Sequence, residues 1–415
     1  MQAPNDFTTV NTAFFHPIDG LAASSPHARP CPELTDDDWL RLGVHRVLET
    51  VASGRAFLQE HGPRFENTPG HSNYFASLRS PRRRDLAGDV NERLIASALL
   101  PDRLVHIPEL AGYTCVAIDL HWHQAAAHDI RHEGVKMPAG HCYSLDLRSQ
   151  LLRHLAVGQD LHEHDLSVLR RVRPKGLRQG TPKGRRTIVV YDRAGVCLGF
   201  WRRCRRECAV YFISRLKEGM VYELLDRREL DRNDPRNGGV EEDRLVRMSD
   251  GQTMRVIRYV EPLTGRVYEF LTNEPDLPAC VIVELYRRRW DVEKVFDQLK
   301  NKVTERKAWA TSLVAKEAQG HLTALTQNML LLYEQRIGDR HGVNNEVEDR
   351  RRRKRAEKLA QTAQSAGREV SSLLLGVRRA TQRSVKFIRW LRHALRESLA
   401  EQPAVTQLAR LYATS

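Results

Sequence analysis

One stretch constrains this chain more than any other: a run of 26 residues, 281–306, that contains neither glycine nor proline. Its length and composition predict a single long helix. The stretch contains four polar residues of interest: Tyr286, Arg289, Glu293 and Lys300. The last three follow Tyr286 by three, seven and fourteen residues. A helix would place them on one stripe, within roughly 60° of arc. The residues expected to face a core lie on a different arc: Leu285, Val292, Val295, Phe296 and Leu299.

The chemistry of this stripe suits a metal ion that holds a phosphodiester. A carboxylate binds the metal, and a neighbouring guanidinium and ammonium offset the charge of the phosphate. An ordinary amphipathic helix whose charged face happens to carry these residues is the alternative interpretation.

Two apolar runs upstream of this helix each end in a carboxylate. Residues 113–120 read YTCVAIDL and residues 187–192 read TIVVYD, which predicts buried strands that deliver Asp119 and Asp192 to their carboxyl ends. Open α/β sheets place their chemistry at that edge. Either residue could instead be a turn residue that follows a strand.

Three other aspartates compete with Asp119 for the first position: Asp129, Asp146 and Asp165. Asp146 lies inside a strand-like run, and the other two follow no apolar run, so Asp119 is preferred.

The spacing Tyr-x2-Arg-x3-Glu-x6-Lys in the first stretch resembles the signature helix of the DDE transposases of bacterial insertion sequences, of the insertion sequence four type. The lead-in LTNEPDLPACVIVELYRRRW, at 271–290, resembles that family as well. The run Asp-Arg-Ala-Gly that begins at Asp192 resembles the context of the family's second catalytic aspartate. The likeness extends over about residues 111–330.

The resemblance implies a reaction, a fold and a set of roles. It implies metal-dependent cleavage of DNA at the ends of a mobile element, followed by strand transfer into target DNA. The catalytic residues and metal ligands would be Asp119, Asp192 and Glu293, which hold two Mg²⁺ ions that Mn²⁺ can replace. The residues expected to bind DNA phosphates are Tyr286, Arg289, Lys300 and Arg193. The protein would act as a homodimer on DNA.

The implied α/β fold has a ribonuclease-H-like core, a mixed five-stranded sheet with helices, interrupted by a β-rich insertion and flanked by helical regions. We expect these regions along the chain: a mobile arm at 1–34, a helical, DNA-binding domain at 35–105, the catalytic core at 106–216 and 273–337, the insertion at 217–272, and a basic helical region at 338–415.

The charge of the chain favours a polyanionic partner. There are 66 Lys and Arg residues against 52 Asp and Glu, a formal net charge of +14. The longest apolar runs, such as 94–100, are far too short to span a bilayer. The amino terminus lacks the pattern of a secretory signal, and seven scattered cysteines fit a reducing compartment, so we expect a cytoplasmic protein at the bacterial nucleoid.

Several features leave other interpretations open. His121 and His123, with Asp119, could bind zinc or iron, and Cys204 and Cys208 could share a helical face. The arginine runs at 82–84 and 350–355 could contact DNA or form solvated basic surfaces. Two rival functions are a nuclease that cuts without joining and an inactive, DNA-binding remnant of a mobile element.

Overall fold

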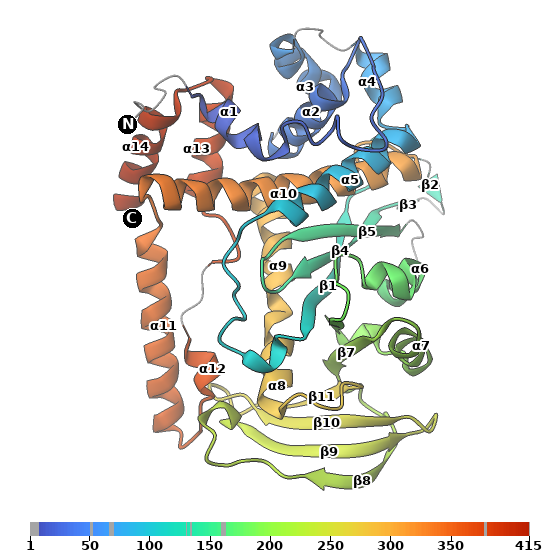
Figure 1. The fold of residues 1–415 in the computed structure, drawn as a ribbon, viewed down its shortest axis with the longest axis vertical. Coiled ribbons are helices and arrows are strands. Elements are labelled where there is room, and N and C mark those ends of the chain that lie inside the picture. Colours follow the sequence, from blue (N-terminus) through green and yellow to red (C-terminus); the bar gives the residue numbers. More distant parts are fainter. Residues whose placement is uncertain are drawn as a thin grey trace.

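A computed structural model describes residues 8–49, 53–65, 70–129, 131–132, 135–158, 163–376 and 380–414. A long helix, α10 (Leu313–His341), crosses the molecule between a layer of helices and a mixed sheet. Figure 1 shows the helical layer on one side of α10 and the sheet on the other. Among the described residues, no helix is both long and apolar enough to cross a membrane.

The sheet has nine strands in the order β5-β4-β1-β6-β7-β11-β10-β9-β8. At one end of this order, β4 is antiparallel to both β1 and β5, whereas β6 is parallel to both β1 and β7. The strands of this part are β1 (Tyr113–His123), β4 (Ala139–Asp146), β5 (Leu152–Gly158), β6 (Arg186–Val190) and β7 (Val210–Arg215). A separate two-stranded ribbon consists of β2 (Arg131–His132) and β3 (Val135–Lys136).

The predicted mixed sheet with helices is confirmed, but the predicted size of five strands is wrong. The insertion supplies β8 (Tyr222–Arg228), β9 (Val240–Met248), β10 (Thr253–Val260) and β11 (Val267–Thr272). Its last strand, β11, pairs antiparallel with β7, so the insertion continues the same sheet. The physical reason is that β7 would otherwise leave a row of unpaired backbone groups at the edge of the sheet.

Helices cover both faces of the sheet because its central strands are apolar on both sides. On one face, α6 (Asp165–Leu177) and α7 (Leu198–Cys208) pack on alternate residues of β1 such as Val116 and Ile118. On the other face, α8 (Ala279–Arg288) and α9 (Trp290–Asp297) pack on Cys115 and Ala117. Residues of β1 with odd numbers therefore face α8 and α9.

The helical layer combines both ends of the chain around α10 in one hydrophobic core. Its helices are α1 (Val10–Phe15), α2 (Asp36–Leu48), α3 (Gly54–His61), α4 (His71–Ser77), α5 (Pro81–Ser97), α13 (Val385–Arg396) and α14 (Glu401–Ala413). The expectation of a mobile arm at 1–34 differs from what is observed from residue 8 onward. Val10, Phe14 and Phe15 are fully buried, because this short apolar segment completes the core beside α10 and α13.

The arginines at 82–84 are engaged within the fold. The guanidinium of Arg82 lies 2.7 Å from the carboxylate of Asp36, and Arg83 is buried and donates to a backbone carbonyl. Arg84 pairs with Glu317 of α10 at 2.9 Å. This run ties α5 to its neighbours and presents few cations to a ligand.

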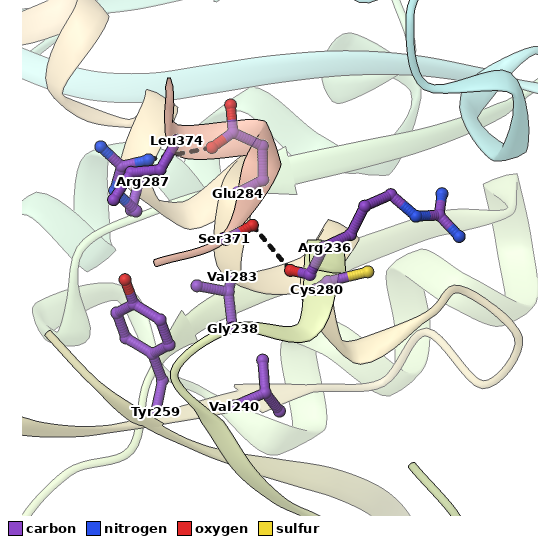
Figure 2. Close-up of a pocket in the computed structure, with 10 residues that line it drawn as sticks. All are labelled: Arg236, Gly238, Val240, Tyr259, Cys280, Val283, Glu284, Arg287, Ser371 and Leu374. Carbon is purple, nitrogen blue, oxygen red and sulfur yellow. Dashed lines mark hydrogen bonds and ion pairs between the residues drawn. The ribbon is translucent and has the colours of Figure 1, made fainter. Parts of the chain in front are cut away.

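Beyond α10 the chain forms α11 (Glu346–Ser365) and the short α12 (Ser372–Leu375). Beside α12, residues of α8 and of the insertion line a small hollow of about 10 Å³. Figure 2 shows these residues. The Ser371 hydroxyl donates to the carbonyl oxygen of Arg236 at 2.6 Å across this contact. The carboxylate of Glu284 is paired with Arg287 at 3.0 Å and with Arg288 at 2.9 Å, so its charge is offset within α8. This hollow is a packing junction.

Candidate active site

The stretch predicted as one long helix consists of three hydrogen-bonded segments. After α8 and α9 comes a π-helical turn, Gln298–Val303. At the first junction Arg289 keeps helical dihedral angles (φ −52°, ψ −36°), and its N–H bonds to the carbonyl of Tyr286, three residues back. The chain is tightened there and does not change direction. The predicted core residues Leu285, Val292, Val295, Phe296 and Leu299 are all buried, which confirms the apolar side.

Asp119 lies within β1, four residues before the strand ends, and not at its end as predicted. One carboxylate oxygen, Oδ1, accepts a hydrogen bond from the backbone N–H of Leu120 at 2.9 Å. The other, Oδ2, lies 3.5 Å from Nη1 of Arg289. Burial raises the pKa of Asp119 to about 6, and the charge of Glu293 adds to the rise, while the Leu120 N–H and Arg289 oppose it.

Arg289 links Asp119 to Glu293. Its Nη1 atom lies 2.5 Å from Oε1 of Glu293, one helical turn further along. The guanidinium side chain is only 8% exposed and lies 5.8 Å and 5.5 Å from the ring centres of Tyr286 and Trp290. The structure therefore brings two of the three predicted carboxylates to a shared cation.

Asp192 follows the end of β6 by two residues and accepts a 2.6 Å hydrogen bond from the N–H of Arg193. The pairing of β1 with β6 is parallel, and Ala117 is opposite Val190. Asp119 lies two residues after Ala117, and Asp192 lies two residues after Val190, so the two aspartates are at matching positions of the register. Within the described part of the chain, no ion pair or hydrogen bond joins Asp192 to the other two carboxylates.

The predicted phosphate-binding residues have different surroundings. Tyr286 is 6% exposed and packs 4.7 Å from the ring of Phe270, and burial raises its pKa. Lys300 is exposed on the π-helical turn, and its charge contributes to the lowered pKa of His121. The side chain of Arg193 is 52% exposed and lies 3.5 Å from Glu218. Their proposed roles on DNA stay predictions.

Of the aspartates that competed with Asp119, Asp146 has a structural role and Asp165 lies near the site. Asp146 accepts from the backbone N–H groups of Arg148 and Ser149, which closes the turn between β4 and β5. Asp165 begins α6, and its pKa is raised by burial and then by the charge of Asp192. It also contributes to the raised pKa of Asp119, so a fourth carboxylate belongs to this neighbourhood. Sequence reasoning passed over Asp165 because no apolar strand precedes it.

Behind the carboxylates, a row of imidazole rings crosses from the sheet, where the rings are buried, to the partly buried His321 of α10. Neighbouring ring centres are 4.6 to 5.3 Å apart, and the row, which we name the histidine ladder, consists of His121, His123, His141, His154 and His321. Burial lowers the pKa of each of these histidines. His162 lies outside the described residues.

The donors at the site fit a hard divalent cation in type, because carboxylate oxygens are its preferred ligands. In this conformation a guanidinium lies between Asp119 and Glu293. No three His, Cys, Asp or Glu side chains within the described ranges are placed to hold a metal ion. This holds for His121 and His123 with Asp119, and equally for Asp119, Asp192 and Glu293 in this conformation. Cys204 and Cys208 both lie on α7, as their spacing allows.

Comparison with known families identifies the class of enzyme. Residues 126–329, just under half of the chain, match the family model described as Transposase DDE domain. The matched segment includes Asp192 and Glu293 and begins after Asp119. The protein is a DDE-type transposase, as the resemblance implied.

One solved structure with a similar arrangement is the piggyBac transposase synaptic complex with hairpin DNA. It is 9% identical, with a TM-score of 0.38, over 98% of this chain and 81% of that chain, and at this level it adds nothing to the assignment. No curated protein sequence matches the chain.

Proposed function

We propose that this transposase cuts DNA at the ends of its own mobile element and joins those ends to target DNA. The observation that carries the proposal is the strand register. Asp119 on β1 and Asp192 just after β6 each lie two residues beyond the paired positions Ala117 and Val190, and Glu293 is linked to Asp119 through Arg289. The family match over Asp192 and Glu293 supports the same assignment.

A ribonuclease-H-like core and the insertion sequence four type are part of the proposal. The order β5-β4-β1-β6-β7, with two antiparallel and two parallel pairings, supports the first. The spacing of Tyr286, Arg289, Glu293 and Lys300 supports the second.

In the proposed mechanism Asp119, Asp192 and Glu293 would hold two Mg²⁺ ions, or Mn²⁺ in their place. Such ions, when bound, lower the pKa of a water or a 3′-hydroxyl nucleophile and stabilise the departing oxygen. Arg289 then turns from the carboxylates to a phosphate oxygen, which a guanidinium can hold through two parallel hydrogen bonds. Tyr286, Lys300 and Arg193 orient phosphates next to the scissile bond.

DNA is the proposed partner, both as element ends and as target, because the chain carries a formal charge of +14 and the family acts on DNA. The proposed assembly is a homodimer on DNA, and the proposed location is the bacterial nucleoid. Light scattering of the protein with and without DNA measures the number of subunits.

The test uses the DNA that flanks this reading frame, labelled at one end and incubated with a supercoiled plasmid and Mg²⁺. The proposal predicts both cleaved ends and labelled plasmid. Cleavage without joined product favours a nuclease, and binding without cleavage in Mg²⁺ or Mn²⁺ favours an inactive remnant. Strand transfer retained by Asp192→Ala or Glu293→Ala rejects the assigned residues.

A further inference from the structure

The second arginine run of the sequence lies on α11 in a setting unlike that of residues 82–84. Five cations of this helix fall within roughly 140° of arc at 100° per residue. We name them the α11 basic stripe: Arg350, Arg351, Lys354, Arg355 and Lys358. All of them are exposed. The stripe extends over eight residue steps, about 12 Å along the helix axis.

The opposite side of α11 faces the protein. Ala363 is buried there, and Leu359 is partly buried. The acidic residues of the first turn pair with the inward-facing Arg352, which lies 3.7 Å from both Glu348 and Asp349. The helix therefore neutralises its inner cation and leaves the outer ones facing solvent.

The charges of the stripe are only weakly paired. Within the part of the chain that the structure describes, Arg351 lies 3.9 Å from Glu348, and no ion pair is formed by Arg350, Lys354, Arg355 or Lys358. By contrast, the arginines at 82–84 are paired with Asp36 and Glu317. Holding like charges together in this way is unfavourable unless a polyanion binds to them.

The helix that carries the stripe is fixed at both ends. Figure 1 shows α11 along one side of the molecule, from α14 in the helical layer to α12 beside the insertion. Just beyond its last residue, Arg368 donates to the carbonyl oxygens of Pro262 and Leu263 at 3.0 and 2.8 Å, which ties this end to the loop between β10 and β11. The stripe therefore lies on a helix whose two ends are held by the rest of the protein.

We propose that the α11 basic stripe binds the sugar–phosphate backbone of a DNA duplex without reading its sequence. A length of about 12 Å matches three to four phosphates of one strand, which are about 3.4 Å apart along the duplex axis. Flexible Lys and Arg side chains on a helix surface suit point contacts to phosphates. This inference rests on the proposed function, because it assigns a further surface to the DNA of the same reaction.

The test compares two triple variants of the full chain. Arg350→Gln/Lys354→Gln/Lys358→Gln removes three cations of the stripe. The matched control, Lys183→Gln/Arg203→Gln/Arg206→Gln, removes three exposed cations near α6 and α7, on the other face of the sheet. Thermal unfolding verifies that both variants fold. A third variant, Lys354→Arg/Lys358→Arg, keeps the charge and should bind like the parent protein.

Binding to a labelled 30-base-pair duplex of arbitrary sequence is measured by fluorescence anisotropy between about 50 and 200 mM salt, the range over which phosphate contacts are lost. Loss of three phosphate contacts should weaken binding by about tenfold or more and reduce the slope of log K against log salt by about 2.7. The control variant should change both quantities much less.

An unchanged salt slope in the stripe variant, or equal effects in the two triple variants, would overturn the inference. Loss of binding to polyglutamate with unchanged binding to the duplex would also overturn it, since the stripe would then be a protein-binding surface. The experiment can reject the inference without rejecting the proposed function, and the reverse. A stripe variant that binds the duplex normally, in a protein that cuts and joins, removes only the inference; stripe-dependent binding without cleavage removes only the function.

Discussion

Two polar groups lie on the same face of β1, and their surroundings differ in kind. Asp119 keeps partial exposure, 19% of its side chain, and has a guanidinium within 3.5 Å. His123, four residues further along the same strand, is 1% exposed and lies against other imidazole rings. The first position can hold a charge, whereas the second favours a neutral ring.

One strand thus contains a position suited to catalysis, at Asp119, and a position that serves packing, at His123. At the Asp119 end, two partly exposed carboxylates, Asp119 and Glu293, contact the buried guanidinium of Arg289. At the ladder end, a row of uncharged rings fills the space between the sheet and α10. Changes at the first end should affect activity and spare the fold, and changes at the second should do the opposite.

The largest expected effect is on catalysis. Asp119→Asn, Asp192→Asn and Glu293→Gln, each alone, should lower strand cleavage by roughly 10⁴-fold, as expected for loss of a catalytic group. The far-ultraviolet circular dichroism spectrum and duplex binding should stay close to those of the parent. Asp146→Asn, which alters a turn, is the control and should keep most of its cleavage activity. Comparable losses in all four variants would erase the distinction between site and scaffold.

The second effect is a loss of stability in acid. His141 and His154 have pKa values well below the ordinary 6.5, because burial disfavours their charged forms. The unfolded chain therefore binds more protons than the native protein just below pH 6.5. Above that pH the two histidines leave the free energy of unfolding unchanged. As pH falls below it, the free energy of unfolding decreases by about 1.4 kcal/mol per pH unit for each histidine.

Urea unfolding between pH 7.5 and 5 measures this dependence. Lys316 and the pair Arg84 and Asp85 also face the ladder and contribute to its field. His154→Gln should flatten the curve, whereas substitution of the exposed His128 by Gln should leave it unchanged. The parent's curve also contains the opposite effect of the buried Glu305, whose raised pKa of about 7 adds stability as pH falls. An identical pH dependence in His154→Gln and in the parent would therefore show that the ladder takes up protons in the native state.

A third effect is steric. A methyl group added at Gly320 of α10 would lie 2.4 Å from the ring of His154 and 2.8 Å from that of His141. Gly320→Ala should therefore destabilise the protein by about 1 to 3 kcal/mol, despite the better helix propensity of alanine. Gly199→Ala in α7, where nothing lies within 4 Å, should stabilise it by up to about 1 kcal/mol. Equal midpoints in chemical denaturation would contradict close packing at the ladder.

The smallest effect is on metal affinity, because Arg289 offsets the charges of the two carboxylates it contacts. Arg289→Gln leaves Asp119 and Glu293 without their shared positive charge, so it should raise the affinity of the free protein for Mn²⁺ by about tenfold, or about 1.4 kcal/mol. Electron paramagnetic resonance of free Mn²⁺ measures the affinity. Arg287→Gln, at a residue that pairs with Glu284, is the control. Weaker Mn²⁺ binding by Arg289→Gln would mean that the guanidinium assists the metal.

The sequence predicted those parts of the structure that depend on local pattern. Apolar runs located the strand that contains Asp119 and the strand that precedes Asp192, and helical spacing located the buried side of α8 and α9. Three features depended on distant contacts and could not be predicted. These are the joining of β11 to β7, the burial of Phe14 and Phe15 against α10 and α13, and the position of Asp165 beside the site.

Charge runs illustrate the same limit. The runs at 82–84 and 350–355 are both rich in arginine in the printed sequence, yet one is paired within the fold and the other is largely exposed. Pairing depends on which acidic residues approach from other elements, such as Glu317 of α10, and local sequence does not contain that information.

The most direct test of the account is a crystal structure of the protein with a DNA end and Mn²⁺, in which anomalous scattering locates the ions. We expect Mn²⁺ bound by the carboxylates of Asp119, Asp192 and Glu293, with Arg289 turned to a phosphate. Ions held elsewhere, with these three carboxylates more than about 10 Å apart, would contradict it.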